Sequence, residues 1–205
     1  ANIAHGNSSI IADKLALGAA DFVVTEAGFG SDMGAEKFMH IKAANSGKSP
    51  DCVVMNVTVR SMKLHGGAFG DRASRIPSKE EIEKEDVAAV KAAAESNLDR
   101  HIRNMAEFGM PVVVSVNRFA SDTDAELNCI IECARASGAS EVCLTEVHAK
   151  GGHGGAALAK AVVSACQDHI AAGRPFTPLF NNDTPIEEKA LRVATRIYGA
   201  DGINI

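Results

Sequence analysis

Several features that define common protein classes are missing from this chain of 205 residues. No apolar run reaches the roughly 18 to 20 residues that a membrane-spanning helix needs, and the first residues lack the charged-then-apolar order of a signal peptide. The formal net charge of -5 argues against the basic surface that nucleic-acid-binding proteins carry. We therefore predict a cytoplasmic protein that binds neither a membrane nor nucleic acid.

The cysteines and histidines form no pattern typical of a metal site. The five cysteines are an odd number without a Cys-x-x-Cys pair, and the seven histidines show neither His-x-x-x-His nor His-Glu-x-x-His spacing. Cys129 and Cys133 lie one helical turn apart, and we interpret them as core residues of a helix rather than as metal ligands. The sequence predicts reduced cysteines and no metal held by protein ligands.

Strand-like and helix-like segments alternate along the chain. Valine-rich runs that are apolar on both faces predict strands of a covered parallel sheet; they are residues 22–25, 52–59, 112–116 and 142–147. Ser78 and Thr123 each begin a capping box, which predicts helices over residues 78–108 and 123–138. Further helices are predicted over residues 155–172 and 185–198. This alternation indicates an α/β fold with a mostly parallel sheet flanked by helices.

The segment from Val23 to Phe38 has the composition of a binding loop. An apolar run ends at Glu26, and a glycine-punctuated stretch with a second carboxylate, Asp32, leads into a helix. Glycines at this point let the backbone turn tightly and approach a ligand without side-chain obstruction. The segment predicts a site at the end of a strand.

Three motifs, in this order along the chain, resemble the formate–tetrahydrofolate ligase family. They are Asn2-Ile-Ala-His-Gly-Asn-Ser-Ser9, the segment from Val23 to Phe38, and Val114-Ser-Val-Asn-Arg-Phe119. The resemblance implies formylation of tetrahydrofolate by formate and ATP through formyl phosphate. It also implies ATP with Mg²⁺ and tetrahydrofolate as substrates, a monovalent cation as a possible activator, and a homotetramer.

The GxxxxGK[ST] loop that cradles ATP phosphates in this family is absent from the sequence. We therefore expect a chain cut at both ends that matches roughly the middle third of a family member. The implied fold is similar to a P-loop nucleotide-binding domain without its phosphate loop, over residues 1–118. The start of a second α/β domain is expected over residues 119–205.

The resemblance implies four folate-binding residues. Glu26 would read the pterin N3–H and 2-amino pair with its carboxylate, and Phe38 and Phe119 would pack against the folate. His148 stands where the family usually has a tryptophan that sandwiches the folate, so the stacking area is smaller. The alternatives are solvation or helix capping for Glu26 and core burial for the two phenylalanines.

Nucleotide binding is expected at the ends of two predicted strands, where ligands of open α/β sheets gather. Asn117 follows one strand, and its amide suits a purine edge, although an Asn that caps the following turn would look the same. Lys150 follows the next strand and provides a point charge for a phosphate, and Gly151 and Gly152 allow main chain to approach a ligand. No residue is assigned a catalytic role.

Two other functions stay open. A non-catalytic folate-binding or nucleotide-binding module would also lack the phosphate loop. One half of a split enzyme would be inactive until a partner chain supplied that loop. In either case this chain alone would not form 10-formyltetrahydrofolate.

Overall fold

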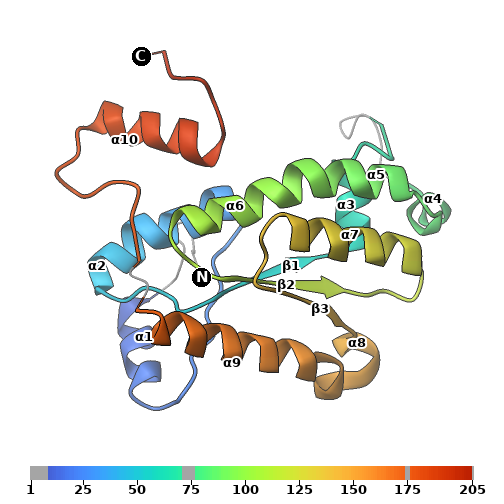
Figure 1. Cartoon of the computed structure of the whole chain (residues 1–205), viewed down its shortest axis with the longest axis horizontal. Coiled ribbons are helices and arrows are strands. Elements are labelled where there is room, and N and C mark those ends of the chain that lie inside the picture. Colours follow the sequence, from blue (N-terminus) through green and yellow to red (C-terminus); the bar gives the residue numbers. More distant parts are fainter. Residues whose placement is uncertain (1–8, 71–76, 174–175, 205) are drawn as a thin grey trace. The chain divides into compact units, whose positions relative to one another are not determined.

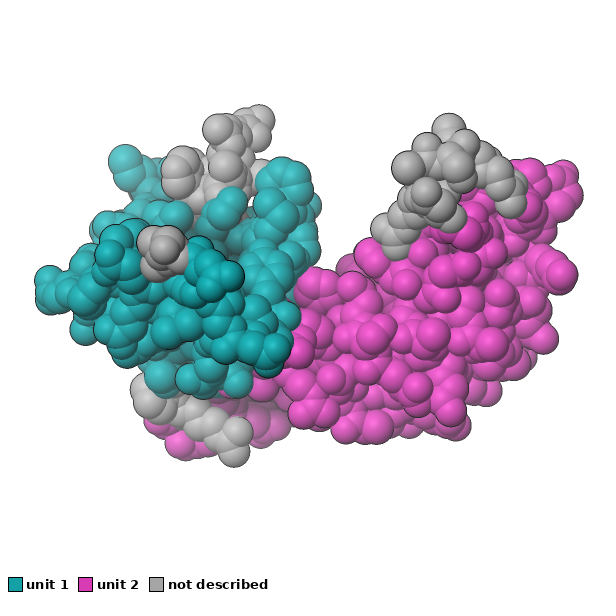
Figure 2. Space-filling view, turned by 90° about the horizontal axis from the view of Figure 1, so that it is seen from above, with its two compact units in different colours: residues 1–50, 107–109, 175–205 teal, residues 51–106, 110–174 magenta. Residues whose placement is uncertain are grey.

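The structure is a computed structural model, and it describes residues 9–70, 77–173 and 176–204. Most of the motif from Asn2 to Ser9 lies outside these ranges. The chain divides into two compact units, which are coloured in Figure 2. Unit 1 comprises residues 1–50, 107–109 and 175–205, and unit 2 comprises residues 51–106 and 110–174. The predicted division between residues 118 and 119 stays a prediction.

Unit 2 is built around a three-stranded parallel sheet in the order β1-β2-β3. The strands are β1 (Val53–Val57), β2 (Val112–Asn117) and β3 (Glu141–Thr145). Val114 of the central strand pairs with Met55 on one side and Val142 on the other. All five residues from Val112 to Val116 are buried, as expected for a strand covered on both faces. The predicted α/β fold is confirmed.

Helices cover both faces of this sheet, with α7 on one side and α9 on the other (Figure 1). The helices of unit 2 are α3 (Val59–His65), α4 (Lys79–Glu83), α5 (Val87–Ala93), η3 (Ala94–Leu98), α6 (Asp99–Glu107, whose last residue belongs to unit 1), α7 (Asp124–Ala136), α8 (Val147–Lys150), η4 (Gly151–Gly155) and α9 (Ala156–Ala171). Within the described ranges, none of the helices has the length and apolar character needed to cross a membrane.

The predicted helix over residues 78–108 is interrupted, which the sequence pattern did not indicate. The capping box at Ser78 forms, but α4 ends at Glu83 and Lys84 has an extended backbone. A new helix starts after Asp86, whose carboxylate accepts a hydrogen bond from the backbone N–H of Ala89 at 2.9 Å. Asp86 is therefore the N-cap of α5, and the chain is not helical between Glu83 and Val87.

Unit 1 packs its helices around a small aromatic cluster. Its elements are α1 (Ile10–Leu17), η1 (Ser31–Ala35), η2 (Phe38–Ala43), α2 (Ala44–Ser46), α10 (Ile186–Arg192) and η5 (Val193–Ile197). The ring of His40 stacks on Phe180 with centroids 3.9 Å apart and meets Phe108 edge-on at 5.2 Å. Its Nε2 accepts from the Leu179 N–H at 3.0 Å, and its Nδ1 contacts Glu36 at 2.7 Å. The imidazole therefore joins segments distant in sequence.

The predicted strand over residues 22–25 is wrong. These residues form no strand, the side chain of Phe22 is 54% exposed and that of Val24 is 93% exposed. A strand becomes stable only when a neighbouring strand pairs with its backbone groups. The described part of unit 1 contains no strand that could serve as that neighbour.

Candidate functional site

The carboxyl edge of the sheet in unit 2 brings two loops to neighbouring positions. Asn117 at the end of β2 pairs with Thr145 at the end of β3. The backbone N–H of Arg118 donates to the carbonyl oxygen of Thr145 at 2.9 Å, so the two chains stay paired beyond the strands. Because the strands are parallel, the loops that follow Asn117 and Thr145 leave the sheet side by side.

The loop after β2 holds Phe119 away from the core, with its side chain 50% exposed. The N–H of Phe119 donates a hydrogen bond to Oδ2 of Asp122 at 2.8 Å, and the N–H of Asp122 donates one to the carbonyl oxygen of Phe119 at 3.1 Å. Burial is the main cause that raises the pKa of Asp122, and the nearby charge of Glu126 raises it further. The hydrogen bond from Phe119 and the charges of Lys63 and Arg118 lower this pKa by a smaller amount. A closed turn thus holds an exposed aromatic ring.

A buried ion pair lies beneath this loop. Nζ of Lys63 and Oε1 of Glu126 are 2.7 Å apart, with the two side chains 2% and 0% exposed. Nζ also donates to the carbonyl oxygens of Ile82 at 3.0 Å and Lys84 at 2.8 Å. The pair ties α3 to the break between α4 and α5 and to the first turn of α7, which follows the Phe119 loop.

Glu126 is held as a carboxylate by several donors. Besides Lys63, the N–H of Asp86 donates to it at 2.8 Å, and the N–H and hydroxyl of Thr123 donate at 3.3 Å each. Burial by itself would raise the pKa of Glu126, but these hydrogen bonds outweigh burial and lower it. The charged form is therefore the native form at neutral pH.

The loop after β3 is folded back on itself by a backbone hydrogen bond between its two ends. The N–H of Glu146 donates to the carbonyl oxygen of Gly154 at 3.1 Å, and a Cβ at Gly154 would lie 2.4 Å from the carbonyl oxygen of Glu146. Lys150 forms an ion pair with Glu146, which lowers the pKa of the glutamate. A Cβ at Gly151 or Gly152 would meet no atom within 4 Å, so open space adjoins the backbone there.

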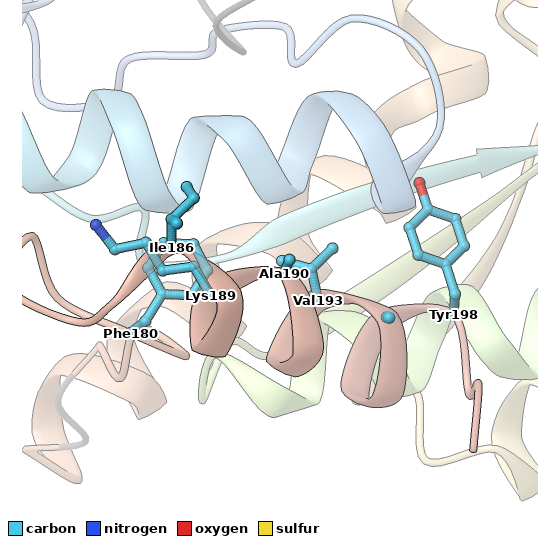
Figure 3. Close-up of a pocket in the computed structure, with 7 residues that line it drawn as sticks. Phe180, Ile186, Lys189, Ala190, Val193 and Tyr198 are labelled. Carbon is cyan, nitrogen blue, oxygen red and sulfur yellow. The ribbon is translucent and has the colours of Figure 1, made fainter. Parts of the chain in front are cut away.

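Unit 1 contains a separate shallow hollow of about 480 Å³ on one side of α10 and η5 (Figure 3). Phe180, Lys189 and Tyr198 line it, together with aliphatic side chains. None of the residues proposed from the sequence for folate or nucleotide binding lines this hollow. Its lining carries one charged group, Lys189, which lies over the Phe180 ring at 5.7 Å.

Comparison with known proteins identifies the family. The model of the family described as formate–tetrahydrofolate ligase matches residues 1–205. The chain belongs to the formate–tetrahydrofolate ligase family. It is 46% identical over 203 residues to the formate–tetrahydrofolate ligase of Desulforamulus reducens, covering 99% of this chain and 35% of that protein. The ligase of Symbiobacterium thermophilum is 44% identical over 205 residues, covering 100% of this chain and 34% of its own length. The chain thus spans about a third of these relatives.

Six of the residues that resemblance to the ligase family suggested lie at the carboxyl edge of the unit 2 sheet. Asn117 is half-buried at the end of β2, Phe119 is exposed in the next loop, and His148 is exposed in α8. The three residues of the glycine loop, Lys150, Gly151 and Gly152, are also exposed. These six residues therefore lie at the end of β2 and on the two segments that follow β2 and β3, and the 50% exposure of Phe119 excludes the core-burial alternative for its ring.

The other two suggested residues belong to unit 1. Glu26 is exposed in the segment that follows the missing strand. Phe38 is 5% exposed in η2, and Nζ of Lys42 lies 4.0 Å from the centre of its ring. Phe38 is thus part of the core of unit 1. The folate roles of Glu26 and Phe38 stay predictions.

Lys63, Asp122 and Glu126 were not singled out from the sequence as parts of the site. The sequence pattern marked Glu126 only as the acidic residue of the capping box that begins at Thr123. Lys63 lies among apolar residues of α3. The local sequence around such a lysine does not indicate whether its side chain is buried against a partner or exposed to solvent. The two residues are 63 positions apart in the sequence, so only the structure shows that they form an ion pair.

Proposed function

We propose that this chain supplies the folate-binding edge of an ATP-dependent formate–tetrahydrofolate ligase. The reaction joins formate to tetrahydrofolate and gives 10-formyltetrahydrofolate, ADP and phosphate. The observation that carries the proposal is the exposed ring of Phe119 on a closed turn, next to the glycine loop after β3. Family membership over the whole chain supports it.

Formate needs activation because its carboxylate has no good leaving group. Transfer of the ATP γ-phosphoryl group to formate gives formyl phosphate, and the folate N10 amine then displaces phosphate from the formyl carbon. This chain would contribute the folate platform. Phe119 and His148 would cover the two faces of the folate ring system, holding it so that the amine meets the formyl carbon in the correct geometry.

The nucleotide would bind at the same edge. The Asn117 amide, at the end of β2, would donate to and accept from the adenine edge. Lys150 would exchange its partner Glu146 for a phosphate oxygen, and the open space beside Gly151 and Gly152 would admit the ligand against main chain. The folate contacts expected of Glu26 and Phe38 concern unit 1 and stay predictions from the family resemblance.

The phosphate cradle is assigned to the part of the ligase that this chain does not match, because the sequence has no GxxxxGK[ST] loop. ATP would enter with Mg²⁺, and a monovalent cation would activate the assembled homotetramer in the cytoplasm. The described residues 9–70, 77–173 and 176–204 hold no group of three or more metal-ligating side chains.

Folate binding by the isolated chain tests the proposal. Tetrahydrofolate is titrated into the chain and into Phe119→Ala, with Phe22→Ala as the control because Phe22 is 54% exposed in unit 1. The proposal predicts weaker binding for Phe119→Ala only. Equal affinity of all three proteins would remove Phe119 from the folate site.

A non-catalytic binding module is the second candidate, favoured by the absent phosphate loop. Formate-dependent and ATP-dependent production of 10-formyltetrahydrofolate separates it from a split enzyme. The chain is assayed alone and after mixing with a polypeptide that carries the phosphate loop. Product in the mixture supports the ligase segment, whereas folate binding without product in any mixture supports the module.

A further inference from the structure

The turn over residues 119–122 is anchored to the buried part of unit 2 at both of its ends. Before the turn, the N–H of Arg118 donates to the carbonyl oxygen of Thr145, whose side chain is buried. After the turn, the hydroxyl of Thr123 accepts the N–H of Glu126 at 3.3 Å, and the Glu126 side chain is 0% exposed. The four residues between these anchors therefore form a short projection with two fixed ends.

Asp122 closes this projection with its side chain as well as with its backbone. The backbone bond from the N–H of Asp122 to the carbonyl oxygen of Phe119 is the ordinary closure of a four-residue turn. The second bond runs the other way, from the N–H of Phe119 to Oδ2 of Asp122 at 2.8 Å. A hydrogen bond to a carboxylate is stronger than one between neutral groups. The Asp122 side chain thus adds the stronger of the two contacts.

The carboxylate of Asp122 occupies this place at a cost in hydration. Its side chain is half-buried, and burial is the main cause that raises its pKa. Among the contributions that lower this pKa, the hydrogen bond from Phe119 is the largest, followed by the charges of Lys63 and Arg118. The contact with the Phe119 backbone is therefore the main interaction that favours the charged form of Asp122 in the turn.

This contact determines the direction of the Phe119 ring. The side chain leaves the backbone at Cα, so holding the N–H and the carbonyl oxygen of Phe119 restricts where its half-exposed ring can point. A ring held in one direction before a ligand arrives loses little freedom on binding. A ring that samples several directions binds more weakly, in proportion to the fraction of time spent in the competent one.

We propose that Asp122 is a positioning residue of the folate site, whose carboxylate holds the backbone of Phe119 so that the ring faces the ligand. This inference rests on the proposed function, because it takes Phe119 as the ring that stacks on folate. Asp122 itself touches no ligand in this account. Its effect on binding passes through Phe119.

Titration of tetrahydrofolate into the chain tests the role of the carboxylate. Asp122→Ala removes the acceptor and should weaken binding about tenfold, because the competent direction of the ring becomes a minor one. Asp122→Asn keeps an acceptor oxygen and should stay within about threefold of the unchanged chain. Asp124→Ala is the matched control, because Asp124 lies two residues further along with its side chain 82% exposed. This control should leave the affinity unchanged.

A double-mutant cycle separates positioning from a general structural role. Asp122→Ala is made both in the unchanged chain and in Phe119→Ala. If Asp122 acts through Phe119, its substitution should change the affinity by less than about twofold once the ring is absent. An equal loss in both backgrounds would show that Asp122 supports the site independently of the ring, and it would overturn the proposal.

Amide hydrogen exchange at Phe119, followed by NMR, tests the contact without folate. The exchange should be at least about tenfold faster in Asp122→Ala than in the unchanged chain, and nearly unchanged in Asp122→Asn, because protection depends on the hydrogen bond. A thermal melt shows whether each variant is folded. If Asp122→Ala does not fold, Asp122→Leu takes its place, because leucine fills the space of the carboxylate without an acceptor. Unchanged exchange in the folded variant would overturn the proposal.

These readouts distinguish failure of this inference from failure of the proposed function. Equal folate affinity of Phe119→Ala and the unchanged chain would contradict the proposed function, whereas fast exchange in Asp122→Ala would still support Asp122 as the residue that fixes the ring. If Phe119→Ala weakens binding and Asp122→Ala does not, the positioning role is overturned and the folate role of Phe119 stands. An equal loss in Asp122→Asn and Asp122→Ala would overturn it as well, since the acceptor oxygen would then be irrelevant.

Discussion

Unit 1 and unit 2 differ in how completely each buries its apolar residues. In unit 2 the strand β2 is buried from Val112 to Val116 between α7 and α9. In unit 1 the helix α1 has no buried residue, and Val24 is almost entirely exposed. The comparison teaches that the sheet of unit 2 is covered on both faces, whereas unit 1 leaves large apolar side chains such as Ile11, Leu15 and Val24 exposed.

The largest expected loss of stability comes from breaking the buried ion pair of unit 2. Lys63→Met leaves the Glu126 carboxylate uncompensated at 0% exposure, which should lower the free energy of unfolding by about 3–5 kcal/mol in urea denaturation. The control Lys79→Met removes an exposed charge 3.7 Å from Glu83 and should cost less than about 0.5 kcal/mol. The double variant Lys63→Met with Glu126→Leu should recover much of the loss, and no recovery would argue against an uncompensated charge as the cause.

Two isoleucines test the comparison of the units directly. Ile130 in α7 is completely buried, and Ile11 in α1 is 73% exposed. Ile130→Ala should destabilise unit 2 by about 2–5 kcal/mol through lost contacts and a cavity. Ile11→Ala should change stability by less than about 0.5 kcal/mol. Thermal and urea unfolding measure both, and equal losses would contradict the contrast between a closed and an open unit.

Removing the exposed ring of Phe119 should change the affinity for tetrahydrofolate and leave the stability of the chain nearly unchanged. Phe119→Ala should weaken tetrahydrofolate binding by about 1–3 kcal/mol, in the range of lost aromatic stacking. Because the ring is 50% exposed, the melting temperature should stay close to that of the unchanged chain. Isothermal titration calorimetry and a thermal melt separate the two effects. A lowered melting temperature with unchanged affinity would assign Phe119 to folding alone.

The last comparison concerns the reaction rates of the thiols, all of which lie in unit 2. Burial is the main reason that the pKa of Cys52 is raised to about 12, and the neighbouring Cys166 adds to it. Since the thiolate is the reactive form, Cys52 at pH 8 should have roughly a thousandfold less thiolate than a thiol of pKa 9.0. Its rate with a disulfide reagent should rise with pH through pH 10. Peptide-resolved mass spectrometry measures the rate, and a fast reaction at pH 8 would contradict a closed unit 2.

Cys129 gives a related comparison on α7. Burial raises its pKa to about 11, and Cys133 one turn away contributes. Both side chains are half-buried on α7. Cys129 should therefore react faster than Cys52 at the same pH.

The sequence predicted unit 2 well because its signals are local. Alternating segments and the capping boxes at Ser78 and Thr123 identified the strands and two helix starts. Segment lengths were less certain. The predicted strand over 142–147 ends at Thr145, because Val147 begins α8, and the predicted helix over 78–108 is divided by Asp86.

Two parts could not be predicted because they depend on distant partners. Residues 22–25 have strand composition, but a strand needs a neighbour that the described part of unit 1 does not contain. At the candidate site the loops after β2 and β3 were anticipated from the positions of Asn117 and Lys150. The ion pair of Lys63 with Glu126 was not, because its two residues are separated by 63 positions and neither carries a local signal of burial.

The most direct test of the central claim uses a full-length chimera in which this chain replaces the matched region of the Desulforamulus reducens ligase. The measurement is its production of 10-formyltetrahydrofolate. The chimera should form product only when formate, ATP and tetrahydrofolate are all present, and Phe119→Ala should reduce its activity at limiting folate. The chain by itself should form none. A chimera that folds and binds ATP but makes no product would contradict the account, and so would turnover by the isolated chain, since its sequence contains no phosphate loop.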